Sequence, residues 1–536
     1  MISWPRVHSE ASYQRLERGL GIKGAPASRR PFHQRQRPQP AGWADPPAAR
    51  VHNAAVSTAI VTSPGLVEQQ GVDVIAESDR RGRPRDLFWP WCAGNILLLQ
   101  VAWGAYLFDF GLSFGQAMAV TLFGVVASFA LVGIVSLVGM RGSAPTLVLS
   151  RAAFGVRGNL LPGLVGYLLM LGWETVNVSV AVLASGTIAG RLGIPPGPTR
   201  VVVFVAVVAV VMGLGILGFD AVMRAQKWFS WITLAMSVAY MALTVRHVRW
   251  SALGEHPAGD ALAVLGACVM VFCAFGAGWT TAGGDYSRYL PRSSSRPGIV
   301  GWTTLGGSLP VVMLIGYGLL LCGTDPALAA AVVEDPIGGL AILVPTWFLL
   351  PFWFFALCGL VSGATLDLYS SGLALVAMGL PIRRWQAAAL DGVLMSIASI
   401  WVVWFATDFL GVFEGFLITL GVPEAAWAGI FLADLVMVRW ARGYDERKLF
   451  DATSAGYGSV RWPAVVLMLL CCWLGFGMVT NSAAGWLAWQ GYLLEPLGLG
   501  GRDGRWAGTS IGVLLALVLG FVAMLPFARR EALRGR

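Results

Sequence analysis

The stretch AFGAGWTTAGGDYSRYLP, residues 274–291, closes a long apolar run that begins near Ala261. Four glycines surround one tryptophan, and an acidic and a basic residue follow at once: Gly276, Gly278, Gly283 and Gly284, then Trp279, Asp285 and Arg288. Glycine in a helix interior costs about 1 kcal/mol relative to alanine. A helix weakened where it approaches its charges predicts either an interruption or very close packing against a neighbour.

The composition is that of a membrane protein. Hydrophobic residues make up 56% of the 536 residues, charged residues 12%, and the mean hydropathy is +0.67, whereas a soluble chain carries about 25% charged residues. Apolar runs long enough to cross a hydrocarbon core of about 30 Å recur. We expect an all-α polytopic membrane protein with twelve transmembrane helices, at about residues 88–112, 116–139, 160–189, 198–217, 227–245, 261–284, 297–322, 344–378, 388–407, 409–437, 462–482 and 506–527.

The distribution of lysine and arginine predicts the orientation. With an even number of spans both termini share one side, and the loops of that side hold fifteen Lys and Arg residues against six in the opposite loops. The side rich in Lys and Arg is cytoplasmic, so both termini are expected in the cytoplasm. Because topology accounts for the net charge of +9, that charge does not indicate a nucleic-acid partner.

Two predicted spans share an unusual pattern. The first, FWPWCAGNILLLQVAWGAYLFDFG, carries Asn95, Gln100 and, near mid-membrane, Gly104, and the sixth is the glycine-rich stretch, five spans later. Interrupted spans at corresponding positions of two halves are typical of inverted-repeat transporters, in which the freed backbone groups hold an ion or a polar substrate. Packing of small residues is the alternative for one such span, and the symmetric pair favours interruption.

The third span contains LGWETVNVSV, residues 171–180. Trp173 and Asn177 are four residues apart and share one helix face. An indole stacks on a flat ring, and an amide donates and accepts along its edge, so the pair predicts a receptor for a planar polar heterocycle. An interfacial tryptophan with a packing asparagine is the alternative, but Trp173 lies well inside its span.

Carboxylates inside the membrane cost about 2.5–3.5 kcal/mol on insertion scales and are candidates for function. Glu174 in span three and Asp367 in the polar span eight are the strongest of them. For Asp285 we expect a structural ion pair with Arg288, three residues later. The seven cysteines show no metal-ligand spacing, so no metal site is predicted firmly.

Four segments together resemble a known family. They are PTLVLSRAAFGVRGN (145–159), LGWETVN (171–177), GWTTAGGDYSRYLP (278–291) and AAWAGIFLADLVM (425–437). In this order they are similar to signature segments of the nucleobase:cation symporter-1 family, purine–cytosine permease branch, over about residues 67–480. The resemblance implies a LeuT-like fold, with spans 1–5 and 6–10 as inverted repeats and two peripheral helices.

The expected organisation follows. The first 85 residues include RRPFHQRQRPQPAGWADPPAAR, which is rich in Pro, Arg and Gln without periodicity, so they are predicted to be disordered. This segment is either a regulatory tail or a consequence of start-site choice. The predicted regions are a basic cytoplasmic N-terminal tail (1–85), a transmembrane transporter domain (86–528) with repeat one (88–245), repeat two (261–437) and peripheral helices (462–527), and a cytoplasmic C-terminal tail (529–536).

The resemblance also implies a substrate site between spans one, three, six and eight. By position it assigns six substrate contacts: Gln100, Trp173, Asn177, Phe275, Trp279 and Asp367. The base is expected to stack between Trp173 and the Trp279 region, while the polar side chains read its edge. Asp367 departs from the asparagine usual in the family, and is expected either to accept from an exocyclic amine or to titrate.

The coupling ion is expected to be H⁺ or Na⁺, with no organic cofactor. Sodium-coupled members of the family set carbonyls of span one against paired hydroxyls of span eight. The matching groups are the carbonyls of Ile96 and Leu99 and the hydroxyl of Ser362, but Gly363 stands where a second hydroxyl is expected. The missing ligand favours H⁺, with Glu174 or Asp367 as the carrier.

We therefore predict a monomeric secondary active symporter that imports nucleobases, cytosine or purines, across the cytoplasmic membrane by alternating access. Its partners are the nucleobase and the lipid bilayer. Other flat heterocycles, namely allantoin, a hydantoin, uracil or thiamine, are the alternative substrates. An enzyme is disfavoured because no nucleophile motif, metal-ligand cluster or phosphate loop stands in the sequence, and a passive channel because paired interrupted spans favour alternating access.

Overall fold

The computed structural model describes residues 67–68, 70–406, 409–481 and 485–534. These residues form helices, turns and connecting segments, and no strand occurs among them. These residues belong to one unit that spans Ser63–Arg536. Most of the predicted N-terminal tail, and the last two residues of the predicted C-terminal tail, lie outside the described residues. The expected all-α class is confirmed.

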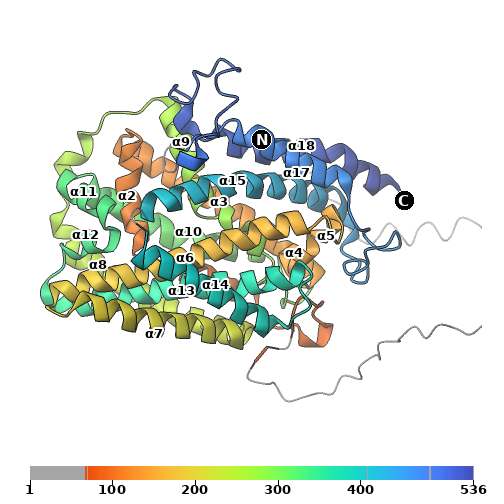
Figure 1. Cartoon of the computed structure of the whole chain (residues 1–536), viewed down its shortest axis with the longest axis horizontal. Coiled ribbons are helices and arrows are strands. Elements are labelled where there is room, and N and C mark those ends of the chain that lie inside the picture. Colours follow the sequence, from red (N-terminus) through yellow and green to blue (C-terminus); the bar gives the residue numbers. More distant parts are fainter. Residues whose placement is uncertain (1–66, 69, 407–408, 482–484, 535–536) are drawn as a thin grey trace, which may run out of the picture. The chain divides into compact units, whose positions relative to one another are not determined.

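Eighteen α-helices, α1 to α18, follow one another along the described chain (Figure 1). The α-helices are α1 (Phe88–Ala93), α2 (Leu99–Asp109), α3 (Phe114–Gly142), α4 (Thr146–Leu149), α5 (Arg151–Phe154), α6 (Leu160–Arg191), α7 (Pro196–Leu217), α8 (Phe219–Thr244), α9 (Ala261–Ala274), α10 (Arg296–Cys322), α11 (Pro326–Glu334), α12 (Pro336–Ala341), α13 (Leu349–Ala377), α14 (Arg384–Trp404), α15 (Phe409–Asp434), α16 (Trp440–Arg442), α17 (Trp462–Phe476) and α18 (Ile511–Arg534). The 3-10 helices are η2 (Glu77–Asp79), η3 (Pro84–Leu87), η4 (Val245–His247), η5 (Trp250–Gly254), η6 (Ala277–Ala282), η7 (Thr346–Phe348), η9 (Gly485–Leu487) and η10 (Ala507–Thr509), and Leu435–Arg439 is a π-helix.

Ten helical segments in the described part of the chain are long and apolar enough to cross a bilayer. Span one does not form a single helix, because it is divided into α1 and α2, and span eleven is α17, of 15 residues. A helix lies at each of the twelve predicted positions. The count of twelve spans is nevertheless not confirmed by helix length.

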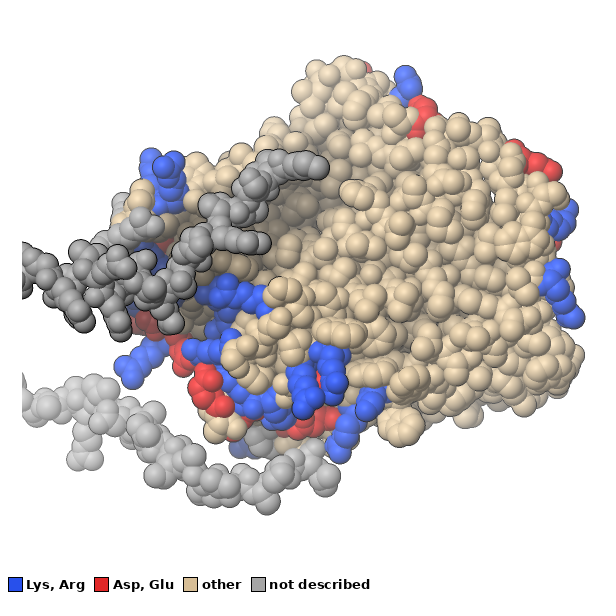
Figure 2. Space-filling model, turned by 180° about the vertical axis from the view of Figure 1, so that it is seen from behind, with Lys and Arg blue, Asp and Glu red and all other residues tan. Residues whose placement is uncertain are grey.

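The surface separates charged from apolar side chains. Figure 2 shows Lys, Arg, Asp and Glu gathered toward two ends of the face it presents, with uncharged residues over the area between them. Large apolar side chains on the outward faces of several helices, such as Phe123, Val202, Trp228 and Trp473, are exposed. Apolar surface of this extent is stable where lipid covers it, so the chain is a multi-pass membrane protein.

The two ends of the bundle differ in charge. We call one the arginine-rich end; its arginines include Arg80, Arg81, Arg141, Arg288, Arg292, Arg384 and Arg439. The opposite end carries Arg200, Arg249 and Arg505. Each long helix connects these ends; α6 starts at the arginine-rich end at Leu160 and finishes at Arg191.

The two predicted repeats interlock through corresponding helices. Spans two and seven are α3 and α10, which pack along each other, and spans three and eight are α6 and α13, which also pack along each other. The peripheral helices α17 and α18 pack against α15, as Figure 1 shows. Both predicted repeats therefore contribute to one core, in the arrangement expected of the LeuT-like fold.

Both predicted interruptions exist. The first span breaks at Gly94–Leu98, between α1 and α2, and the sixth breaks at Phe275 and Gly276, between α9 and η6. Phe275 has φ −109° and ψ −101°, outside the helical range. A helix broken inside the bundle leaves backbone groups free to bind other partners.

Gly104, the glycine near mid-membrane in the first span, does not lie at the interruption. Gly104 lies inside α2, ten residues after the actual break begins, and a Cβ at this position would overlap the backbone of Gly318 in α10. A helix–helix approach this close requires glycine. Close packing, the alternative considered for a glycine-rich span, therefore accounts for Gly104, and the interruption lies at Gly94–Leu98 instead.

The end of the predicted N-terminal tail packs on the arginine-rich end. Ile75 is buried, and its backbone N–H donates to the carbonyl of Ser143 at 2.8 Å. Arg80 donates to the carbonyl of Leu290 at 2.6 Å. These residues were expected to be disordered, and long-range contacts hold them in place instead.

Candidate substrate and cation site

The two broken helices meet in the core. Trp91 of α1 contacts Trp279 of η6 edge-on, with ring centroids 5.7 Å apart. Trp103 of α2 contacts Phe275, at the sixth-span break, in the same way at 5.1 Å. These aromatic pairs hold the two interruptions side by side, as expected of paired broken spans.

Helix α13 approaches the first break because it carries a glycine there. A Cβ at Gly359 would lie 3.0 Å from the carbonyl oxygen of Ile96. Ser362 follows three residues later, on the same side of α13. Its hydroxyl donates to Oε1 of Gln226 in α8, whose Nε2 donates back to the carbonyl of Ser362 at 3.0 Å. Gln226 is thus an additional polar group beside the predicted cation ligands Ile96, Leu99 and Ser362.

Asn177 and Asp367 face each other across the α6–α13 contact. The Asn177 Nδ2 donates to Asp367 Oδ2 at 3.4 Å, and Gly363 leaves room for the amide, since a Cβ there would lie 2.9 Å from Nδ2. Both side chains are buried, and the Asn177 Oδ1 has no hydrogen-bond partner within the described chain. This amide–carboxylate pair offers one free acceptor and further carboxylate lone pairs.

The other predicted substrate residues surround the breaks. Gln100 is buried in the first turn of α2. Trp173 of α6 lies beside Gly278, where a Cβ would come within 3.7 Å of the indole Nε1. Of the two tryptophans predicted to stack on the base, Trp279 therefore belongs to η6 and Trp173 lies beside it.

A large cavity reaches the first break from the opposite end. Its volume is about 660 Å³, and it is lined by Leu99, Trp103 and Tyr106 of α2, Val176 of α6 and, near the mouth, Asp335 among others. Of the predicted site residues only Leu99 lines it directly, while Gln100 and Asn177 are the chain neighbours of lining residues. Trp103, which the sequence prediction missed, stands one helical turn after Gln100, and that spacing is the signal that indicates it.

A second, smaller cavity of about 40 Å³ lies beside η6. Trp173, Gly278, Thr280 and Glu424 are among its lining residues, and the Thr280 hydroxyl donates to Glu424 Oε1 at 2.6 Å. Such a volume accommodates ordered water rather than a heterocycle. The six predicted substrate residues do not share one cavity: Trp173 lines this one, and Trp279 packs on Trp91.

The carboxyl group of Glu174 lies on the arginine-rich side of Asn177. It is fully buried, and neither oxygen has a hydrogen-bond donor among the residues that the structure describes. Asp391 of α14, which the sequence prediction missed, neighbours this carboxyl group. No group of three His, Cys, Asp or Glu suited to a metal ion occurs in the described ranges.

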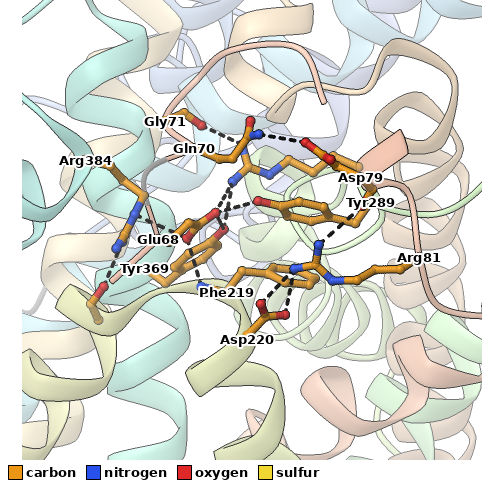
Figure 3. Close-up of polar contacts among 12 residues, drawn as sticks. Glu68, Gln70, Gly71, Asp79, Arg81, Phe219, Asp220, Tyr289, Tyr369 and Arg384 are labelled. Atoms are coloured by element: carbon orange, nitrogen blue, oxygen red, sulfur yellow. Dashed lines mark hydrogen bonds and ion pairs between the residues drawn. The ribbon is translucent and has the colours of Figure 1, made fainter. Parts of the chain in front are cut away.

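A cluster around Glu68 closes the arginine-rich end (Figure 3). We define this Glu68 cluster as Glu68, Phe219, Arg288, Tyr289, Tyr369 and Arg384. Glu68 Oε1 accepts from Arg288 Nη2 at 2.9 Å and from the Tyr289 hydroxyl at 2.7 Å. Its Oε2 accepts from the Phe219 backbone N–H at 2.8 Å and pairs with Arg384 Nε at 3.2 Å.

The Glu68 cluster joins three helices and the turn after η6 to the segment before span one. Phe219 begins α8, Tyr369 lies in α13, Arg384 begins α14, and Arg288 follows η6. The expected ion pair between Asp285 and Arg288 is absent from the described chain, because each has another partner. Asp285 Oδ1 instead accepts from the backbone N–H of Thr146 at 2.9 Å.

The segments that resemble the family contact one another. Thr146, from PTLVLSRAAFGVRGN, binds Asp285, from GWTTAGGDYSRYLP. Ser150, from the first of these, accepts a hydrogen bond from the Trp427 indole of AAWAGIFLADLVM at 2.9 Å. Three of the four segments therefore pack against one another.

Comparisons with known proteins agree with this architecture. Residues 74–493 match the sequence profile of the permeases for cytosine/purines, uracil, thiamine and allantoin. The Bacillus subtilis protein named purine-cytosine permease YxlA is 24% identical over 474 residues, which cover 87% of this chain and 98% of that protein. The Saccharomyces cerevisiae purine-cytosine permease FCY2 is 27% identical over 299 residues, 52% of this chain and 53% of the yeast protein.

Solved structures share the fold. Mhp1, a nucleobase-cation-symport-1 family transporter in a closed conformation with bromovinylhydantoin bound, gives a TM-score of 0.64 at 17% identity, covering 87% of this chain and 97% of Mhp1. A Na⁺-coupled sialic acid symporter gives a TM-score of 0.58 at 14% identity, covering 86% and 92%. With the profile match over most of its length, the chain belongs to the nucleobase:cation symporter-1 family of permeases for cytosine/purines, uracil, thiamine and allantoin.

Proposed function

We propose that this protein is a cation-coupled symporter that imports nucleobases, cytosine or purines, through the cytoplasmic membrane. The observation that carries the proposal is the large cavity, which reaches Leu99 at the first-span break and Val176, the chain neighbour of Asn177 in the Asn177–Asp367 pair. A carboxylate accepts from an exocyclic amine, and an amide both donates and accepts, so the pair complements the edge of cytosine or adenine. Trp103 supplies an aromatic wall in the cavity.

The structure has the features of an outward-facing state in this proposal. The cavity extends toward the opposite end, while the Glu68 cluster closes the arginine-rich end. By the positive-inside rule the arginine-rich end is cytoplasmic. Transport then requires the Glu68 cluster to separate as the cavity closes, so that the substrate is released on the other side.

Thiamine is the second candidate substrate. Three carboxylates line the cavity, Asp109, Glu334 and Asp335, against one guanidinium, Arg200. An excess of negative charge attracts a cationic ligand, and thiamine carries a permanent positive charge.

Uptake by cells that express the protein tests the proposal. Radiolabelled cytosine is offered in competition with adenine, hypoxanthine, uracil, allantoin and thiamine, and radiolabelled thiamine is offered separately, with vector-only cells as the control for both. The proposal predicts saturable cytosine uptake that adenine or hypoxanthine suppresses. Saturable uptake of thiamine alone supports the second candidate, and no saturable uptake of any compound contradicts both.

A further inference from the structure

Three buried carboxyl groups lie together between α6, α13 and α14. Glu174 and Asp391 are 0% exposed and Asp367 is 2% exposed. Asp391 neighbours the Glu174 carboxyl group and the Tyr167 hydroxyl. Glu174 stands three residues before Asn177 on α6, toward the arginine-rich end. Glu174 and its neighbour Asp391 therefore lie between the proposed substrate pair and the cytoplasmic side.

The hydrogen bonding of this cluster is incomplete. Ser371 donates to Asp391 Oδ2, but Asp391 Oδ1 and both oxygens of Glu174 have no donor within the described chain, and the Tyr167 hydroxyl has no acceptor there. An ionised carboxylate only accepts hydrogen bonds, whereas a protonated one also donates. A proton between Glu174 and Asp391 supplies the donor that the cluster lacks.

The surroundings do not neutralise two negative charges. From α6 the cluster is faced by Tyr167 and Asn177, and from α13 by Asp367 and Ser371, none of which is cationic. The charged groups on the helices packed against the cluster either have other partners or lie far from it. Three have partners elsewhere: Arg384 of α14 binds Glu68 and two α7 carbonyls, Glu424 of α15 accepts from Thr280, and Asp434 of α15 pairs with Arg439. The others lie at the ends of the bundle: Arg200 of α7 lies at the opposite end beside Gly186, and Asp220, Arg224 and Lys227 of α8 lie at the arginine-rich end. Adjacent like charges in a membrane interior oppose each other's ionisation.

We propose that Glu174 and Asp391 share one proton and that this pair carries the coupling proton of the symporter. The inference rests on the proposed function and deepens it. The pair takes up one proton from the extracellular side while the cavity is open, and it gives that proton to water on the cytoplasmic side after the Glu68 cluster separates. The nucleobase itself gains and loses no bond in this cycle.

Tyr167 marks the route of release. It lies two helical turns before Glu174 on α6, about 10 Å nearer the arginine-rich end at 1.5 Å per residue, and it approaches Asp391. Ser371 flanks the same carboxyl group from α13. Hydroxyl groups can pass a proton because they donate and accept.

Purified protein in Na⁺-free proteoliposomes, with radiolabelled cytosine as the probe, tests the pair. With one proton per base, an inward gradient of one pH unit drives about tenfold accumulation. We expect Asp391→Asn and Glu174→Gln to abolish this accumulation while cytosine counterflow persists, because exchange needs no net proton movement. Asp391→Glu keeps a carboxyl group and is expected to retain accumulation. Glu495→Gln, an exposed carboxylate outside the core, is the matched control and is expected to behave as wild type.

Three results overturn the inference. One is full accumulation by Asp391→Asn under the pH gradient. Another is wild-type accumulation driven by a Na⁺ gradient at clamped pH and not by protons, which leaves the proposed nucleobase transport intact. If counterflow also fails in Asp391→Asn, equilibrium cytosine binding is measured as a function of pH. The inference predicts that binding depends on pH in the wild type and not in the variant. The third overturning result is the same pH dependence in both proteins.

Discussion

Glu68 Oε1 lies 2.9 Å from Arg288 Nη2, which joins the segment before the first span to the end of the interrupted sixth span. The guanidinium is 0% exposed and the carboxylate 9% exposed. Removing one partner of a buried ion pair costs about 3–5 kcal/mol, because it leaves the other charge without compensation. This contact is therefore a large part of what keeps the arginine-rich end closed.

Glu68→Gln is expected to loosen that closure. The amide cannot compensate the charges of Arg288 and Arg384, so residues 70–85 should detach more often and exchange their amide hydrogens faster. Hydrogen exchange followed by mass spectrometry measures this. Asp73→Asn is the matched control in the same segment, because Asp73 is exposed and forms no ion pair among the described residues. Equal protection in the two variants would contradict the role assigned to Glu68.

Asp367→Asn is expected to weaken the preference for cytosine over uracil. Cytosine presents an exocyclic amine where uracil presents a carbonyl, and a hydrogen bond to a charged group contributes about 1.5–3 kcal/mol. Cytosine affinity should fall by about tenfold or more, with a smaller change for uracil. Equilibrium binding of both bases to the purified protein measures the ratio, and an unchanged ratio removes Asp367 from the substrate site.

Gly104→Ala tests the close approach of α2 and α10. The added methyl group overlaps the backbone of Gly318, and overpacking of a core costs about 1–3 kcal/mol. We expect a lower thermal unfolding midpoint in detergent. Gly115→Ala, at a position with no atom near the added methyl group, should leave the midpoint unchanged or raise it, since alanine favours a helix by about 0.5–1 kcal/mol. A similar midpoint for both variants argues against the packing role.

The predicted orientation has its own test. A fluorescent protein fused after Arg536 should be fluorescent, and alkaline phosphatase fused at the same position should be inactive, because the C-terminus is expected in the cytoplasm. Fusions to the chain truncated after Arg249, in a loop at the opposite end, should show the reverse pattern. Active phosphatase after Arg536 contradicts the assignment of the arginine-rich end to the cytoplasm.

Local sequence patterns predicted the spans and the sixth-span break, because apolar length and clustered glycines are local properties. The position of the first break did not follow from the sequence pattern, because Gly104 does not lie at it. Only one glycine, Gly94, stands in the interruption. Gly104, which interrupts the apolar pattern of the span most clearly, packs against Gly318 instead. Sequence spacing does not distinguish these two uses of glycine.

The missed residues depend on contacts between distant segments. Glu68 stands in a segment that the sequence indicates to be a tail, and its partners come from α8, α14 and the turn after η6, all more than 100 residues away. Asp391 lies seven residues after Arg384 and reads as a charge near the end of a span, yet it is buried beside Glu174. The sequence identifies Asn177 and Asp367 only as polar residues on two separate helices and does not show that they contact each other. Their pairing depends on the close approach of α6 and α13 at Gly363.

A cryo-electron microscopy structure of the protein with cytosine bound tests the central claim most directly. The account predicts density for a planar ring at the inner end of the large cavity, against Trp103 and within hydrogen-bonding distance of Asn177 or Asp367, with the breaks at Gly94–Leu98 and at Phe275 and Gly276 preserved. A ring bound away from both breaks, or first and sixth spans that are continuous helices, would contradict it.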